Sequence, residues 1–148
     1  MNEFTLRVLG TPAPQGSKRA FKHKTTGKLV VVEQQHDRVK SWRQAILDAV
    51  ENAPGFDCPV SLSITFLLER KAGHYGTGRN AGILRPSAPQ FPGAMPDLSK
   101  LVRATEDALT NAGVWRDDGQ VVTLHVAKRW ADPVTLPGAI ILIKEARL

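Results

Sequence analysis

The chain has 148 residues, of which 42% are hydrophobic, and 20 basic against 14 acidic residues give a formal net charge of +6. This length is enough for one domain with its own core, so we expect residues 1–148 to form a single domain. A single cysteine, Cys58, excludes an internal disulfide and a cysteine-based zinc site. The sequence has no apolar run long enough to span a membrane and no signal-peptide pattern at its start. We therefore expect a cytoplasmic protein with no membrane partner.

The excess of positive charge favours an acidic partner. Contacts from lysine and arginine to phosphates supply most of the non-specific affinity of DNA-binding proteins, so nucleic acid is the leading candidate. A basic protein without such a ligand would have the same composition. Net charge therefore leaves both interpretations open.

The first part of the chain predicts a strand followed by a hairpin. Phe4, Leu6 and Val8 occupy alternate positions, which is typical of a strand. Residues 25–28 read Thr-Thr-Gly-Lys and predict a turn that leads into a strand at residues 29–32, where a leucine precedes three β-branched valines.

The next two elements are a helix and a strand. Val39, Trp42 and Ile46 recur at spacings of three and four, which predicts an amphipathic helix over residues 36–53. Apolar residues then alternate with serine and threonine over residues 60–68, which predicts a strand.

Residues 69–95 form a long segment that is rich in glycine and proline and shows no periodicity. Its basic residues include Arg70, Lys71 and Arg79. Because loops of this length inside a domain are usually functional or disordered, we interpret the segment as a mobile cationic loop that orders on a ligand.

The last part of the chain predicts a second helix and two strands. Residues 98–112 follow the helical spacing of apolar positions without a break, and Gly113 predicts the end of the helix. Residues 121–126 and 139–143 predict the strands.

Isolated acidic residues flank the second helix. Asp97 precedes it and Asp118 follows it. The helix would be about 20 Å long, and the extended chain between residues 111 and 118 would be about as long. If residues 111–118 ran back along the helix in an extended conformation, Asp118 would lie beside Asp97. Because Mg²⁺ prefers carboxylate oxygens and activates water for phosphodiester hydrolysis, such a pair suits a magnesium site.

A second interpretation needs no metal. An aspartate before a helix is commonly an N-cap, and the sequence Asp117-Asp118-Gly119 is common in turns. In that case the chain would be a basic protein with an ordinary cap and turn. Spacing alone leaves both interpretations open.

A run of motifs adds a family resemblance. The motifs read D-L-x-x-L, then D-A-L-T, then W-x-D-D-x-Q-V-V, and they lie within residues 96–122. The residues that carry them are Pro96, Asp97, Leu98, Ser99, Lys100, Leu101, Arg103, Asp107, Ala108, Leu109, Thr110, Gly113, Trp115, Asp117, Asp118, Gly119, Gln120, Val121 and Val122. In this order and spacing they resemble the RusA family of Holliday junction resolvases, which are often encoded by phages and prophages.

The resemblance implies an α/β fold, with one small domain, a mixed β-sheet and two main helices, assembled as a homodimer. It implies a magnesium-dependent endonuclease that cuts four-way junctions and related branched DNA by paired nicks, in recombination and repair. The family's catalytic aspartates fall on Asp97 and Asp118, and Asp117 joins them as a metal ligand. A basic catalytic residue of the family falls on Arg103, where a guanidinium suits phosphate binding but not proton transfer.

One position departs from the family pattern. The family's second aspartate falls on Ser99, whose neutral hydroxyl is a weaker cation ligand. We favour a chain that keeps its activity, because the other motif residues are all present. The alternative is a non-catalytic protein that binds branched DNA.

Basic side chains outside the motifs are candidates for DNA binding. They lie in the predicted hairpin, in the long loop and on the second helix: Lys18, Arg19, Lys22, Lys24, Arg70, Lys71, Arg79 and Lys100. The loop around His74, Tyr75 and Arg79 is also a candidate for stacking on unpaired bases. The alternative for these segments is a solvated basic loop.

Overall fold

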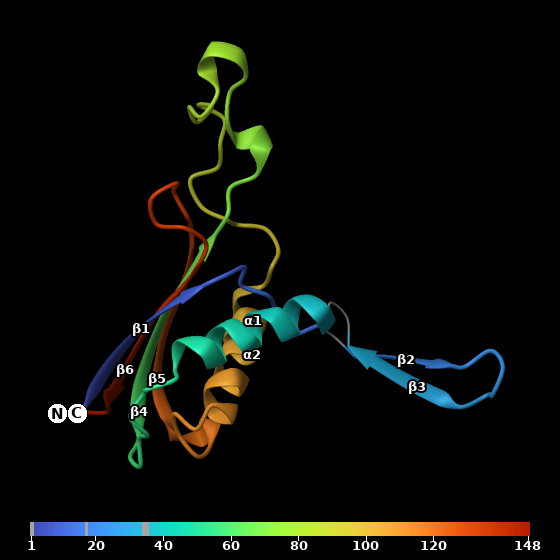
Figure 1. Cartoon of the computed structure of the whole chain (residues 1–148), viewed down its shortest axis with the longest axis vertical. Helices are drawn as coiled ribbons and strands as arrows, with labels where there is room; N and C mark the ends of the chain where they lie inside the picture. The colour runs from blue at the N-terminus through green and yellow to red at the C-terminus, as the bar shows by residue number, and fades with distance from the viewer. Residues whose placement is uncertain (1, 17, 34–35) are drawn as a thin grey trace.

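In the computed structural model, which describes residues 2–16, 18–33 and 36–148, two helices cover one face of a mixed sheet (Figure 1). The sheet has four strands in the order β1-β6-β4-β5, of which only β4 and β5 are parallel. Its strands are β1 (Glu3–Leu9), β4 (Val60–Leu68), β5 (Val121–Trp130) and β6 (Gly138–Glu145). The predicted α/β fold with a mixed sheet and two main helices is confirmed.

Strand β4 lies inside the sheet, and its sequence explains why. Leu62, Ile64 and Phe66 are buried, whereas Ser63 and Thr65 between them are only half-buried. Alternate side chains of a strand point to opposite faces, so the apolar set turns toward the helices and the polar set turns away. The predicted strand has the same bounds as β4.

The two helices are α1 (His36–Ala49) and α2 (Leu98–Asn111). The prediction for α2 is confirmed to within a residue. The prediction that the first helix reaches residue 53 is wrong, because the helix ends at Ala49 and Ala53 N–H donates to Val50 O in a tighter turn. Pro54 disfavours a helical conformation at the residue before it, which is consistent with this early end.

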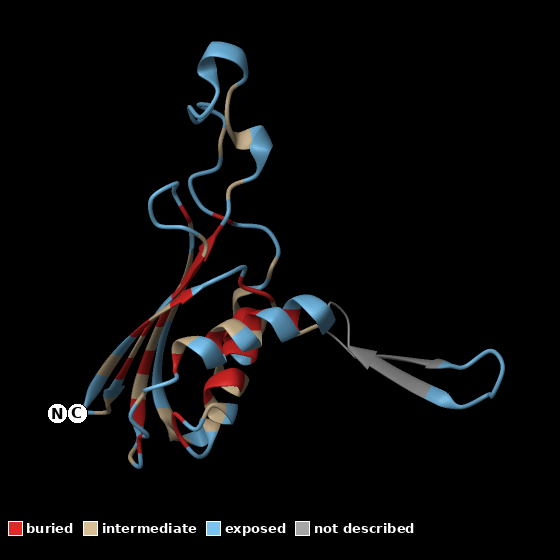
Figure 2. Cartoon of the chain, in the orientation of Figure 1, coloured by how far each residue is buried: buried red, intermediate tan, exposed pale blue. Residues whose placement is uncertain are grey.

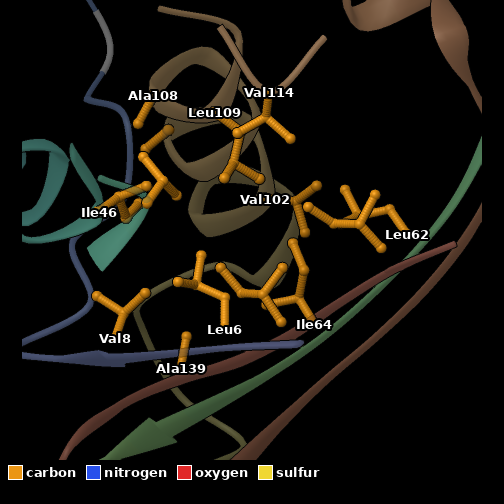
Figure 3. Packing of buried hydrophobic residues seen from close by; sticks show 14 of the residues in the cluster. Leu6, Val8, Ile46, Leu62, Ile64, Val102, Ala108, Leu109, Val114 and Ala139 are labelled. Atoms are coloured by element: carbon orange, nitrogen blue, oxygen red, sulfur yellow. The ribbon is translucent and has the colours of Figure 1, made fainter. Parts of the chain in front are cut away.

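The core lies between the helices and the sheet, as Figure 3 shows for 14 of its side chains. Ile46 of α1 and Leu109 of α2 belong to this cluster together with Leu62 and Ile64 of β4. Figure 2 shows the buried residues as segments on both helices and along the strands of the sheet.

Strands β2 (Lys18–Lys22) and β3 (Leu29–Glu33) form the predicted hairpin, which projects away from the sheet (Figure 1). Lys22 and Lys24 are exposed on it. The side chains of Lys18 and Arg19 lie outside the described residues.

We call residues 69–95 the arm, because Figure 1 shows them extending from the end of β4 away from the sheet. Two 3-10 turns, Ala72–His74 and Gly78–Asn80, are its only regular elements among the described residues. Backbone bonds cross it, such as Gly76 N–H to Ile83 O at 2.9 Å. The segment is a loop, as predicted, and its mobility and its ordering on a ligand stay predictions.

The last two strands are longer than predicted. Strand β5 continues to Trp130 because it pairs in parallel with all of β4, and β6 runs to Glu145 because it pairs with both β1 and β4. None of the helices in the described residues is long and apolar enough to cross a membrane.

A buried hydrogen bond between the helices generates the first prediction. Trp42 Nε1 of α1 donates to Thr105 Oγ1 of α2 at 3.1 Å, and both side chains are buried. Thr105→Val would leave this indole N–H buried without a partner. We therefore expect the free energy of unfolding, measured by urea denaturation, to be about 1–3 kcal/mol lower than in the wild type.

The same change at an exposed site is the control. Thr5 is exposed on β1, and Thr5→Val should change the free energy of unfolding by no more than about 0.5 kcal/mol. Equal stability of Thr105→Val and the wild type would contradict the proposed role of the bond.

Candidate active site at the two ends of helix α2

Asp97 lies at the start of α2. Its backbone carbonyl accepts from Leu101 N–H at 3.1 Å and so opens the helix, but its side chain makes no capping hydrogen bond. The carboxylate is exposed and lies 3.8 Å from Lys100 Nζ. The N-cap interpretation is therefore wrong for this side chain, which faces solvent and remains accessible to a ligand.

At the other end, the chain leaves α2 through a glycine turn. Gly113 has a φ of +79°, which glycine adopts at low cost. Its N–H donates to Thr110 O at 3.0 Å, and Val114 N–H donates to Leu109 O at 3.1 Å. This pair of bonds is a Schellman motif, and it turns the chain sharply back against the helix end.

Asp118 is held against the last turn of α2. Trp115, which is buried, donates through Nε1 to Thr110 Oγ1 at 2.7 Å, and the Thr110 hydroxyl contacts Asp118 Oδ1. The Thr110 hydroxyl has one proton, and its Oγ1 also lies 3.0 Å from Glu106 O, so this proton is shared between the Asp118 carboxylate and the Glu106 carbonyl. Thr110 and Trp115 thus position Asp118.

Asp117 takes part in a turn, as the capping interpretation predicted. Its Oδ1 accepts from Gly119 N–H at 2.9 Å and opens the 3-10 turn Asp118–Gln120. Gln120 Oε1 accepts from Arg116 N–H at 2.8 Å, and its Nε2 donates to Phe56 O at 2.9 Å. One oxygen of Asp117 is therefore used structurally, and the glutamine of the motif ties the turn to the loop before β4.

These residues surround an acidic pocket of about 340 Å³ at the C-terminal end of α2. Asp107 lies there, with its Oδ2 3.5 Å from Arg43 Nη2 of α1. Glu106 is close by, and burial raises the pKa of its carboxyl, with Asp118 and Asp107 raising it further. The pocket is lined by Arg43, Asp107, Thr110, Asn111, Arg116, Asp117 and Asp118.

Asp97 and Asp118 lie at opposite ends of the helix. Thirteen positions separate Asp97 from Thr110, which corresponds to about 20 Å of helix. Strand β5 shows the same separation. Asp118 comes just before the start of β5, whereas Lys128 near the end of β5 donates from Nζ to Pro96 O, next to Asp97, at 2.9 Å. The prediction that the chain after α2 brings Asp118 beside Asp97 is wrong. The Schellman turn and the contact of Trp115 with Thr110 hold Asp118 at the C-terminal end of α2.

The predicted metal ligands therefore do not converge within one chain. Among the described residues, no group of three or more histidine, cysteine or acidic side chains is arranged to hold a metal ion. Asp117 and Asp118 are neighbours at one end of α2, and Asp97 lies alone at the other. A single chain does not fit a magnesium ion bound by all three.

The other predicted residues of α2 lie between these ends. Ser99 and Arg103 are exposed, and Arg103 is about 9 Å along the helix from Asp97. The guanidinium of Arg103 is therefore accessible to a ligand. Lys100 is only half-exposed, and its ammonium faces Asp97.

The predicted DNA-binding residues of the arm differ in their surroundings. Lys71 and Arg79 are exposed. Arg70 has a structural contact, since its guanidinium lies 5.1 Å from the centre of the Trp130 ring and its Nη1 donates to Pro89 O at 2.9 Å. Arg70 therefore ties the two ends of the arm to the end of β5.

Sequence reasoning did not place Arg43 in the acidic pocket or Glu106 beside it. Glu106 is one helical turn before Thr110, on the side of α2 that the return covers, and this spacing is visible in the sequence. The contribution of Arg43 depends on how α1 crosses α2, which no local pattern specifies.

The chain matches a known protein family over most of its length. Residues 10–143 match the family model described as Endodeoxyribonuclease RusA. The matched range includes both ends of α2, the arm and most of the sheet. No individually curated protein matches the chain. The family match agrees with the resemblance carried by residues 96–122.

The raised pKa of Glu106 generates the second prediction. An acid with a raised pKa in the folded chain costs stability once it is ionised, so Glu106→Gln should raise the melting temperature at pH 7. The gain should be small, because the side chain is only half-buried. It should disappear as the pH falls below the ordinary pKa of glutamate, where both states carry the proton.

Melting curves at several pH values measure this effect. Glu51 is exposed after the end of α1, and Glu51→Gln is the control that should leave the melting temperature unchanged. A lower melting temperature for Glu106→Gln at pH 7 would contradict the proposed crowding of acidic groups in the pocket.

Proposed function

The chain belongs to the RusA endodeoxyribonuclease family, and from this we propose that it is a magnesium-dependent endonuclease that resolves Holliday junctions. Its substrates would be four-way junctions and related branched DNA, cut by paired nicks during recombination and repair. The family is one of endodeoxyribonucleases that resolve junctions, so the proposal concerns the activity, metal and assembly of this member.

In this proposal Asp97, Asp117 and Asp118 hold the metal ion, and Arg103 binds the attacked phosphate. Carboxylate oxygens are the ligands that Mg²⁺ prefers, and the bound ion supplies activation of water and neutralisation of charge on the phosphate. The observation that carries the proposal is the state of Asp97, whose exposed carboxylate has no capping role at the start of α2.

Two chains are needed for these carboxylates to share an ion. Asp97 and Asp118 are separated by the length of α2 within one chain, so a common ion requires Asp97 from one subunit and Asp118 from the other. A homodimer with a two-fold axis would form two such sites. Two equivalent sites also suit paired nicks in the opposite strands of a near-symmetric junction.

Strand β5 is a suitable surface for this dimer. It is an edge strand, and residues 121–127 carry no charged side chain that would oppose pairing with another strand. Val122 is 60% exposed and Leu124 is 43% exposed. The charged residues of β5, Lys128 and Arg129, lie only near its end, and the other edge strand, β1, carries Glu3 and Arg7.

Antiparallel pairing of β5 with the partner's β5 would also bring the two half-sites together. The start of one strand would lie beside the end of the other. Asp118 comes just before the start of β5, and Lys128 near its end holds the backbone before Asp97. Asp118 of one chain would therefore face the partner subunit's Asp97.

Ser99 favours a second candidate function. A hydroxyl at this position gives the site one carboxylate fewer than the family pattern, so the chain could bind branched DNA without cutting it. A synthetic four-way junction incubated with and without Mg²⁺ separates the two functions. We expect paired nicks only with Mg²⁺, and binding without any cleavage would favour the second function.

The role of Asp97 gives the third prediction. Asp97→Asn removes the charge but keeps the shape of the side chain, so cleavage of the junction should fall at least about a hundredfold while junction binding persists. Asp48 is exposed on α1, and Asp48→Asn should cleave like the wild type. Full cleavage by Asp97→Asn would overturn the assignment.

The role of Ser99 gives the fourth prediction. Ser99 is exposed beside Asp97, so Ser99→Asp adds a carboxylate to the site without disturbing the core. We expect half-maximal cleavage at a lower Mg²⁺ concentration. Ser99→Asn has nearly the same size without the charge and should not lower the requirement. If Ser99→Asp needs the same Mg²⁺ concentration for half-maximal cleavage as the wild type, residue 99 lies outside the metal site.

A further inference from the structure

A cavity of about 700 Å³ opens where the arm joins the sheet. It lies between residues 11–14, the two ends of the arm and the end of β5. This volume is within the range of pockets that bind small organic ligands. Its lining is mainly apolar and includes Pro12, Pro14, His74, Phe91 and Trp130.

Trp130 is a rigid wall of this cavity. Its Nε1 donates to Pro89 O at 3.0 Å, and the His74 ring meets it edge to face with centroids 5.1 Å apart. Arg70 stacks on the indole but does not line the cavity, so part of the ring remains available to a ligand. A fixed aromatic surface of this kind is suited to stacking.

A second aromatic residue makes the cavity suited to a flat ligand. Phe91 lines the cavity and is 60% exposed, so a second aromatic ring stands at its entrance.

The charges around the cavity favour a ligand that carries negative charge, such as a phosphate. Arg38 and Lys71 line it, with Glu69 as the one acidic lining residue. The arm as a whole carries four basic residues and one acidic residue. A ligand that joins an aromatic heterocycle to phosphates would match this combination of stacking surfaces and positive charge.

The cavity is also connected to the candidate active site. Pro96 lines it, and Asp97 is the next residue. Lys128 fixes this segment by donating from Nζ to Ala94 O at 2.8 Å and Pro96 O at 2.9 Å. A nucleotide bound in the cavity would therefore lie beside the first catalytic aspartate.

We propose that this cavity binds an unpaired nucleobase of branched DNA between Phe91 and Trp130. The inference rests on the proposed function and names a subsite for it. Bases at a branch point unstack more easily than bases within a duplex, because the continuous stack is interrupted there. Capture of such a base would hold the adjacent phosphate beside Asp97 and would favour branched over linear DNA.

Phe91→Ala is the variant that tests the subsite, because its exposed ring contributes little to the core. Ile83 is a matched control on the same arm, since it is 59% exposed and does not line the cavity. Three DNA probes are used in Ca²⁺ to prevent cleavage. They are a four-way junction, the same junction with abasic nucleotides flanking the branch point, and a linear duplex of equal length.

We expect Phe91→Ala to bind the intact junction about fivefold or more weakly, and Ile83→Ala to bind it like the wild type. Phe91→Ala should bind the abasic junction and the duplex with the same affinity as the wild type, because neither probe offers an unpaired base at a branch point. Equal loss on the intact and abasic junctions would overturn the proposal, since the effect of the ring would not depend on the base.

A second probe separates this inference from the proposed function. A short single strand containing 2-aminopurine reports stacking through quenching of its fluorescence, and it requires neither junction recognition nor cleavage. Quenching that is lost in Phe91→Ala but kept in Ile83→Ala supports the subsite even for a protein that cuts no junction. Junction cleavage by the wild type without Phe91-dependent quenching would overturn the subsite and leave the proposed function intact.

Discussion

The hydrogen bonds of the Thr110 hydroxyl fix the arrangement of the candidate site. This hydroxyl accepts from the buried Trp115 indole and contacts the Asp118 carboxylate, so the return after α2 closes against the last turn of the helix. The Schellman turn at Gly113 allows this sharp return, and Gln120 ties the next turn to the loop before β4. Asp118 is therefore held by the fold, at the end of α2 that lies opposite Asp97.

This separation links the metal site, the edge strand and the arm. An ion shared by Asp97 and Asp118 needs two chains, and β5 is an edge strand whose residues 121–127 carry no charge, which suits the proposed pairing with its partner. The far end of β5 carries Lys128, which holds the backbone before Asp97, and Trp130, which forms a wall of the cavity under the arm. One strand thus contributes to the proposed dimer, to the position of Asp97 and to the proposed base-binding subsite.

Local sequence patterns predicted the helices and strands well, but they did not predict the tertiary contacts between them. Alternation along β4 and helical spacing along α2 gave both elements almost to the residue, because burial of one face imposes those periods. The same patterns could not place Asp118, since its position depends on one hydrogen bond from Thr110 and on a glycine turn rather than on periodicity. The contact of Arg43 with Asp107 depends on the crossing of two helices, and the cavity under the arm depends on a segment with no period at all.

Mixing two inactive variants tests the shared site most directly. Asp97→Asn and Asp118→Asn chains, co-expressed and purified as a mixed dimer, would form one site with both aspartates intact and one site with neither. The account predicts that each variant alone fails to cut a four-way junction, whereas the mixed dimer nicks one strand in Mg²⁺. A mixed dimer that binds the junction but makes no nick would contradict it, because a site contained in one chain is damaged in both subunits.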